Sequence, residues 1–254
     1  MAEAAKLCQA HGADVVDINM GCPAKKFARK PAGSALLANP PLVREILEAV
    51  VDAVAIPITL KIRLGQDEQS INVAETAHIA QASGIQALVV HGRTRTQKFS
   101  GRADHSHLRQ LVQQLNIPVI ANGDIDCAIT AQRVLEDTGV TGVMMGRGAR
   151  RNPFLFRETR HLLETGESLP PVNLNELECL AMTHLQRVMR YYDKTGSGRA
   201  ARQLGWLLSG LTGINHLRRE MQQCQDSHQL EQTLKGFLRN TSLAATRNQP
   251  TVAA

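Results

Sequence analysis

Short apolar runs rich in Val, Ile and Leu recur along the first 150 residues and alternate with stretches of helical periodicity. The runs predict β-strands at residues 14–20, 57–62, 87–90, 118–121 and 142–145. The intervening apolar spacing predicts helices at residues 2–11, 41–53, 71–82, 105–115 and 128–137. Such alternation indicates parallel strands that are joined by right-handed crossovers.

This alternation favours an α/β fold of the (β/α)8 TIM-barrel type, in which about 250 residues build eight units. About five of the eight units are expected here, because the pattern changes character after residue 168. An open doubly wound sheet is the alternative, but no glycine-rich GxGxxG turn follows any of the expected strands. We therefore expect residues 1–168 to form an incomplete barrel.

The pattern becomes helical after the Leu-Pro-Pro stretch that begins at residue 169. Asn173 and Glu176 have the spacing of a capping box, and an apolar stripe at helical spacing follows them. Further helices are expected at 199–210, 215–224 and 227–239. The sequence thus predicts an all-α domain over 169–240 and, where periodicity is lost, a disordered tail over 241–254.

Chemically capable side chains follow every expected strand. They are Cys22 after the first strand, Lys61 and Arg63 at the second, His91 and Arg93 at the third, Asn122 and Asp124 at the fourth, and Gly146 and Arg147 at the fifth. Singly, each has an ordinary structural explanation, such as an inert buried thiol, a rim ion pair, a core histidine or a helix cap. Because the carboxyl ends of parallel strands share one face, their coincidence favours a common site.

Two of these strand ends suggest a phosphate-bearing ligand. The turns NGDI, from Asn122, and GRGARR, from Gly146, are short, contain glycine and lead into helices. Exposed backbone N–H groups at such turns bind phosphate, and barrel enzymes often place a phosphate at their last two strands. If the barrel interpretation holds, the ligand carries a phosphate, as flavin mononucleotide (FMN) or another nucleotide does.

Positive charge accompanies the first candidate residue and the C-terminal region. Lys25, Lys26, Arg29 and Lys30 follow Cys22 and would surround its thiol with a field suited to an anionic partner. The whole chain has a net charge of +6, a surplus that makes a polyanionic partner plausible without requiring one. Residues 173–254 hold ten basic and six acidic residues together with every Tyr and Trp of the chain, which suits RNA binding. The alternative is a small helical bundle with an aromatic core and a solvated charged face.

The five cysteines favour a reducing, cytoplasmic location. Their number is odd and no pair has CxxC spacing, so neither a disulfide framework nor a zinc site is expected. We also expect no membrane segment and no secretory leader, because there is no 18-residue apolar run and no basic-then-apolar start.

Five motifs in order, DINMGCPAKK, LKIRLG, VVHGRTR, PVIANGDI and VMMGRGARRNPFLF, resemble those of the tRNA-dihydrouridine synthases, most closely the bacterial B type. The resemblance extends from the first residues to about 240. It implies FMN on a (β/α)8 barrel, NADPH (or NADH) as the reductant, a helical domain that holds tRNA, and reduction of a uridine ring.

The same resemblance implies a role for each strand-end residue. Cys22 corresponds to the cysteine that protonates the uridine, and Lys61 to the lysine that binds the flavin. The flavin phosphate turns fall on Asn122, Gly123, Asp124, Gly146 and Arg147, and the histidine near the flavin falls on His91. Asn19, Arg63 and Arg93 are the expected contacts of the target base.

The sequence also departs from the family pattern. Family members begin with about three further β/α units, which are not part of this sequence, so the expected barrel lacks its N-terminal part. We expect such a sheet to close imperfectly, to dimerise or to be unstable, because parallel sheets do not leave edges and faces open. Two further interpretations stay open: a non-catalytic remnant that keeps RNA binding, and another FMN barrel that acts on a free pyrimidine.

Overall fold

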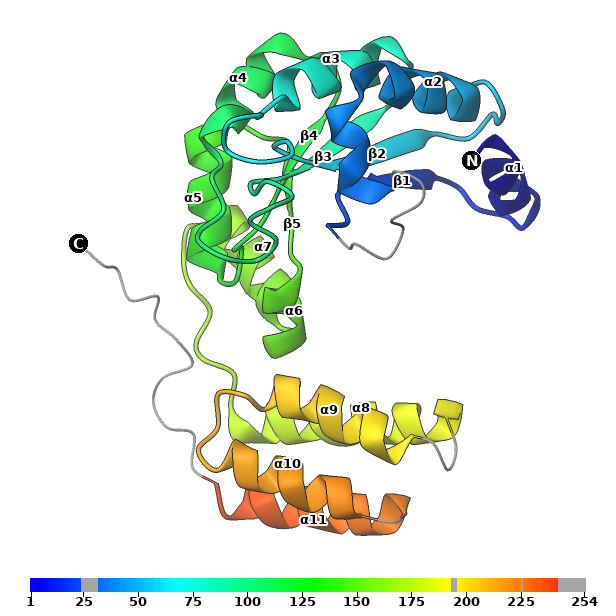
Figure 1. Ribbon diagram of the computed structural model, residues 1–254. Helices are drawn as coiled ribbons and strands as arrows, with labels where there is room; N and C mark the ends of the chain where they lie inside the picture. Colours follow the sequence, from blue (N-terminus) through cyan, green and yellow to red (C-terminus); the bar gives the residue numbers. More distant parts are fainter. Residues whose placement is uncertain (24–31, 193–195, 225, 242–254) are drawn as a thin grey trace. The chain divides into compact units, whose positions relative to one another are not determined.

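The computed structural model describes residues 1–23, 32–192, 196–224 and 226–241 of the chain (Figure 1). These residues fall into two compact units. The first unit is Met1–Ile125 with Ile129–Gly146, and the second is Asp126–Ala128 with the chain from Arg147 onward.

A parallel five-stranded sheet forms the centre of the first unit. Its strands are β1 (Val16–Met20), β2 (Ile58–Arg63), β3 (Ala87–His91), β4 (Val119–Asn122) and β5 (Gly142–Met144). They lie in the order β1-β2-β3-β4-β5, and every neighbouring pair is parallel. The predicted parallel α/β fold is confirmed, and the order lacks the reversal that characterises a doubly wound sheet.

Helices connect the strands and cover one side of the sheet. They are α1 (Ala2–Ala10), α2 (Pro40–Val51), α3 (Val73–Ala82), α4 (Ser106–Gln114) and α5 (Ala128–Thr138), with a 3-10 helix, η2, at Gly33–Ala38. Figure 1 shows α2, α3, α4 and α5 following one another along the same side of the sheet. The Asn39 side chain accepts a hydrogen bond from the backbone N–H of Leu42, which caps the start of α2.

Alternation along the strands gives the sheet two different faces. The face toward the helices is apolar, and its central side chains are at most 2% exposed: Ile18, Met20, Leu60, Ile62, Leu88, Val90, Val119 and Ala121. These side chains belong to one hydrophobic core that also includes Leu47 of α2 and Leu111 of α4. Burying this face fixes the strand register and directs the alternate residues of each strand to the opposite side.

The second unit is helical in its described part. Its helices are α6 (Arg147–Arg151), α7 (Leu155–Thr165), α8 (Leu174–Tyr192), α9 (Ser197–Leu207), α10 (Ile214–Gln223) and α11 (Ser227–Arg239). Leucines from α8 to α11, among them Leu177, Leu204, Leu217 and Leu234, share one buried core. Half of the predicted capping box is present, since the Asn173 side chain accepts a hydrogen bond from the Glu176 N–H at 2.9 Å. The Glu176 carboxylate accepts a hydrogen bond from Arg157 at 3.0 Å instead. That this region is a separate tRNA-binding domain stays a prediction, and most of the predicted tail, 242–254, lies outside the described residues.

The described residues contain neither a membrane-spanning helix nor a cluster of metal ligands. No helix there is long and apolar enough to cross a membrane. No cluster of three or more His, Cys, Asp and Glu side chains suited to a metal ion occurs in the same ranges.

Candidate active site

The polar residues predicted at the strand ends share the face of the sheet that the helices leave uncovered. Asn19 is paired in register with Lys61, Arg63 with His91, and His91 with Asn122. Partners in register, and residues two apart on one strand, point to the same side. The structure therefore brings these five residues together at the carboxyl edge of one face. The strand pattern predicted this convergence for Lys61, Arg63, His91 and Asn122.

Lys61 and Asn122 form the direct link across this face. The Lys61 Nζ donates to Asn122 Oδ1 at 2.8 Å, and the Asn122 Nδ2 donates to the Met144 carbonyl at 2.8 Å. Burial lowers the pKa of Lys61, the nearby Arg63 lowers it further, and Asp17 opposes the shift. Asn122 thus orients a partly desolvated ammonium group and ties β4 to β5.

The turn that carries Cys22 is fixed by its backbone. Both the N–H and the hydroxyl of buried Ser34 donate to the Cys22 carbonyl, at 3.0 and 2.9 Å. Arg63 Nε donates to the Gly21 carbonyl at 2.7 Å, and the Gly21 N–H donates to Asn19 Oδ1 at 2.9 Å. Cys22 itself is exposed. The turn therefore presents a reachable cysteine at the end of β1.

Gly33 allows Ser34 to approach this turn. Its φ is +57°, and a Cβ at this position would lie 2.6 Å from the Cys22 carbonyl oxygen. Any other residue would be strained and would push the turn away. Gly33 and Ser34 were not singled out from the sequence, although a Gly-Ser pair shortly after a Gly-Cys-Pro turn is the signal that would have indicated them.

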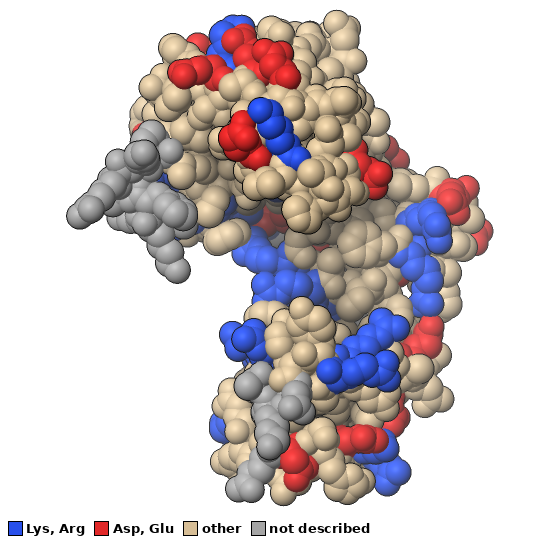
Figure 2. All heavy atoms as spheres, turned by 90° about the vertical axis from the view of Figure 1, so that its right-hand side faces the viewer, with Lys and Arg blue, Asp and Glu red and all other residues tan. Residues whose placement is uncertain are grey.

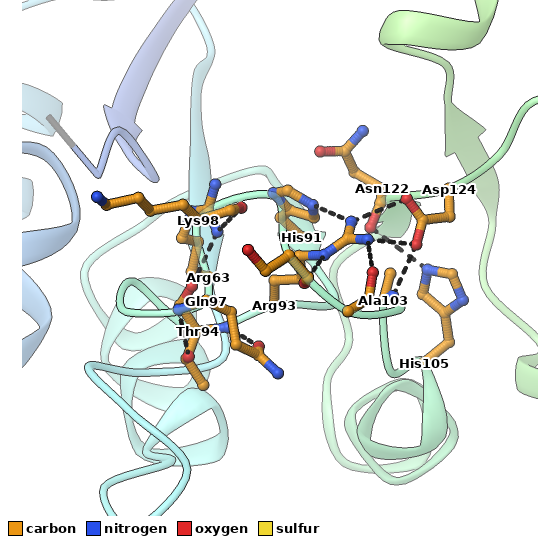
Figure 3. Close-up of polar contacts among 12 residues, drawn as sticks. Arg63, His91, Arg93, Thr94, Gln97, Lys98, Ala103, His105, Asn122 and Asp124 are labelled. Carbon is orange, nitrogen blue, oxygen red and sulfur yellow. Dashed lines mark hydrogen bonds and ion pairs between the residues drawn. The ribbon is translucent and has the colours of Figure 1, made fainter.

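Arg63 is a structural centre of the neighbouring loop (Figure 3). Its side chain is buried, and its Nη1 donates to the carbonyls of Thr94 and Lys98, both at 2.9 Å. The guanidinium also lies 5.7 Å from the centre of the Phe99 ring. One arginine thus connects the Cys22 turn to the loop after β3, a contact that the sequence analysis did not anticipate.

Arg93 and Asp124 form a second polar group, which Figure 3 shows beside the first. Arg93 is only 1% exposed, and its two terminal nitrogens donate to Asp124 at 2.9 and 2.5 Å. The same guanidinium donates to the carbonyls of Ser100 and Gly101. Asp124 also accepts from the Ala103 N–H at 2.8 Å. These partners fix the loop after β3 against the turn after β4.

His91 lies beneath that turn and is kept neutral. Burial lowers its pKa to about 3, and the positive charges of Arg63, Lys61 and Arg93 act in the same direction. Gly123, with φ +114°, lies directly against the ring, so that a Cβ there would be 2.8 Å from His91 Cδ2. The turn therefore requires glycine at this position and holds an uncharged imidazole.

The remaining predicted residues are less fully characterised. Gly146 follows β5, is exposed and has open space beside it. Arg147 begins α6 and belongs to the second unit. The basic residues after Cys22, namely Lys25, Lys26, Arg29 and Lys30, lie outside the described residues.

The arrangement as a whole suits an electron-rich or anionic ligand. Three cations, Lys61, Arg63 and Arg93, lie close enough to influence the pKa of His91, with Asp124 as the opposing charge. An exposed cysteine follows the neighbouring strand. Such a surface has the charge suited to an anion and carries a thiol that can transfer a proton.

Comparison with known proteins gives a consistent result. The family model described as dihydrouridine synthase matches residues 1–242. A tRNA-dihydrouridine synthase B of Serratia marcescens is 44% identical over 96% of this chain and 73% of its own length. The protein of the same name from Escherichia coli K12 is 43% identical over 94% of this chain and 75% of its own length.

Solved structures add little to this result. A prophage protein of the dihydrodipicolinic acid synthase family from Escherichia coli K12 covers 94% of this chain and is covered over 91% of its own length, with 14% identity and a TM-score of 0.42. A likeness of that size has no bearing on the function. The family model and the sequence relatives show that this chain belongs to the dihydrouridine synthase family, in which the bacterial B type fits it.

Proposed function

We propose that the protein is an FMN-dependent oxidoreductase that reduces specific uridines of tRNA to 5,6-dihydrouridine with NADPH or NADH. The observation that carries this proposal is the gathering of Lys61, Arg63, His91 and Asn122 on one open face, next to the exposed Cys22. Membership of the dihydrouridine synthase family supports it. The first unit would then be part of a TIM-type barrel, and the helical region 169–240 would hold the tRNA in the cytoplasm.

The donor groups of the face fit FMN. The Lys61 ammonium has three N–H donors and uses one of them for Asn122 among the described residues, so others can reach a ring carbonyl or nitrogen. Gly123 and Asp124 shape the turn after β4, while Asn122, Gly146 and Arg147 complete the predicted phosphate turns. When bound, FMN would supply the hydride that reduces the uracil ring.

Cys22 would complete the reaction on the uracil. Hydride addition at C6 leaves negative charge that C5 and the O4 carbonyl share, and a proton must be added at C5. The exposed Cys22 thiol donates this proton and recovers one from water afterwards. Asn19 would orient the base through its amide N–H groups, which have no acceptor among the described residues, since its Oδ1 is already used by Gly21.

The two arginines, Arg63 and Arg93, would have different roles in the site. Arg63 holds the Cys22 turn through the Gly21 carbonyl and is close enough to the cysteine to interact electrostatically with it. Arg93 is saturated by Asp124 and by loop carbonyls, so we propose that it positions the loop after β3 instead of touching the base. The expectation was that Asn19, Arg63 and Arg93 all contact the base directly. We do not keep it for Arg93.

The test uses the full chain with added FMN, NADPH and an unmodified tRNA transcript. We expect a retained flavin spectrum after gel filtration and a gain of two hydrogens per modified uridine, measured by mass spectrometry. Cys22→Ala should keep flavin reduction and lose uridine reduction, whereas Lys61→Ala should lower flavin retention. Cys8→Ala, at an exposed cysteine of α1, is the matched control. A colourless protein that forms no dihydrouridine would contradict the proposal.

A further inference from the structure

A cleft in the helical unit has the composition of a phosphate site. It has a volume of 450 Å³ and is lined by Gly198, Ala201, Arg202, Trp206, Arg218 and Gln222. These residues come from facing parts of α9 and α10. Two guanidinium groups and one amide line it, and none of its lining residues is acidic. The volume lies within the range of small-molecule sites and is large enough for a nucleotide.

The first arginine of the cleft is available for a ligand. Arg202 is exposed, and within the described residues its side chain forms neither an ion pair nor a hydrogen bond. A guanidinium offers five N–H donors in a planar fork that matches phosphate oxygens. Arg202 therefore has its full donor capacity free at the mouth of the cleft.

The second arginine is held in place before any ligand arrives. Arg218 donates to the Gly205 carbonyl through Nη2 and to Asn215 Oδ1 at 3.5 Å through Nη1. It lies directly on Gly205, where a Cβ would overlap its side chain. The absence of a side chain at Gly205 lets α10 bring Arg218 close to α9. A fixed guanidinium loses little conformational entropy when it binds an anion.

Arg150, stacked on the ring of Trp206, brings a further positive charge to the cleft. The Arg150 guanidinium carbon lies 3.3 Å from the centre of the Trp206 ring, so α6 contributes an arginine stacked on the wall of the cleft. In Figure 2, several Lys and Arg side chains lie on the surface of the helical unit. The site thus combines three arginines around one indole, with one indole face already occupied by Arg150.

We propose that the cleft between α9 and α10 binds the sugar-phosphate backbone of the RNA substrate, with Arg202 and Arg218 as the phosphate ligands. This inference rests on the proposed function, because it assumes that the polyanion is tRNA. Charge complementarity favours a phosphodiester backbone, and the covered face of Trp206 makes base stacking secondary. The contact would therefore be independent of nucleotide sequence.

The experiment measures tRNA affinity of the full chain as a function of salt concentration. Each phosphate that a basic side chain neutralises changes the slope of log K against log salt concentration by about 0.7 to 0.9. Arg202→Ala should therefore make the slope shallower by about 0.7 to 0.9, the value for one phosphate. It should weaken binding about fivefold to eightfold at 0.1 M salt. Gly205→Ala, which displaces Arg218, should act in the same direction, whereas Arg202→Lys should keep the slope.

The control is Arg219→Ala, which removes an equal charge from an exposed position of α10 outside the cleft. Equal losses in Arg202→Ala and Arg219→Ala would overturn the assignment to the cleft, and so would an unchanged slope in Arg202→Ala. Competition by polyglutamate as strong as that by RNA would overturn the choice of ligand. Uridine reduction by the parent chain is measured in parallel, so these outcomes leave the proposed function standing. A parent chain that binds no tRNA and forms no dihydrouridine would overturn both.

Discussion

Arg63 at the end of β2 and Arg93 just after β3 are both almost completely buried. Their partners differ, because Arg63 donates to three backbone carbonyls, whereas Arg93 forms an ion pair with a carboxylate. A cation bonded to neutral carbonyls keeps its positive field, while a paired cation is largely compensated. The uncompensated positive charge on this face therefore comes mainly from Arg63 and Lys61.

The hydroxyl of Ser34 should matter to the reaction through Cys22. Ser34→Ala removes one of the two hydrogen bonds to the Cys22 carbonyl, which costs about 1 kcal/mol, and it leaves the turn free to shift. We expect about fivefold to tenfold slower uridine reduction with unchanged reduction of the flavin by NADPH. The rate of Cys22 alkylation should change as well. Ser106→Ala, at an exposed serine of α4, is the control, and equal effects of both variants would argue against a positioning role.

His91 should make the stability of the chain fall at mildly acidic pH. Its pKa of about 3 lies below the value of about 6.5 expected for an unfolded chain, so the unfolded state binds the extra proton first. The contribution of the neutral His91 ring to the free energy of unfolding is complete above pH 6.5 and decreases as the pH falls toward 3. Lowering the pH from 7 to 5 should therefore lower the free energy of unfolding by about 2 kcal/mol.

Urea unfolding at both pH values measures this effect. His91→Asn should flatten the pH dependence, whatever it does to the absolute stability. His78→Asn replaces an exposed ring and should leave the dependence as in the parent chain. A parent-like pH dependence in His91→Asn would show that other groups cause it.

At the scale of elements, the regular helices and strands of the first unit were predictable from sequence. Their bounds lie within about two residues of the predicted ranges, because period-2 and period-3.6 patterns are strong over these lengths. The short elements η2 and α6 were not predicted. GSALLA and GRGARR are too short to display a period, and their conformation depends on tertiary partners such as the Cys22 carbonyl.

The candidate site was predictable only in part, for a related reason. Parallel strands place their ends at one edge, so the convergence of Lys61, His91 and Asn122 followed from the pattern. Which acceptor each arginine would choose did not follow, because the loop at residues 94–101 supplies carbonyls whose positions depend on its full path. Sequence reasoning therefore located the site but not the internal bonding that shapes it.

The contact between the loop after β3 and the turn after β4 should contribute strongly to stability. Asp124→Asn leaves the buried Arg93 charge without its counter-ion, while asparagine tolerates the positive φ of 49° at this position. We expect a loss on the order of 3 kcal/mol in the free energy of unfolding, measured by urea denaturation. Glu48→Gln removes the carboxylate of an exposed ion pair on α2 and should change stability by less than about 0.5 kcal/mol. Similar values for the two variants would mean that the buried pair contributes little.

At the scale of the whole molecule, we expect the sheet to associate with a second copy of the chain. In the described ranges, β1 and β5 each pair with a single neighbouring strand, which leaves one backbone edge of each without a partner strand. Light scattering should show a mass that rises with protein concentration. Val15→Lys, beside β1, places a charge at the edge and should weaken association, whereas Leu7→Lys, on α1, should not. A constant monomer mass would contradict this expectation.

The strictly sequential strand order has a consequence for synthesis on the ribosome. Each of β2 to β5 pairs with the strand that precedes it in the chain, so every new β/α unit can dock as soon as it has emerged. No strand has to wait for a distant segment. The order of translation can thus serve as the order of assembly, with new strands added at one edge of the sheet.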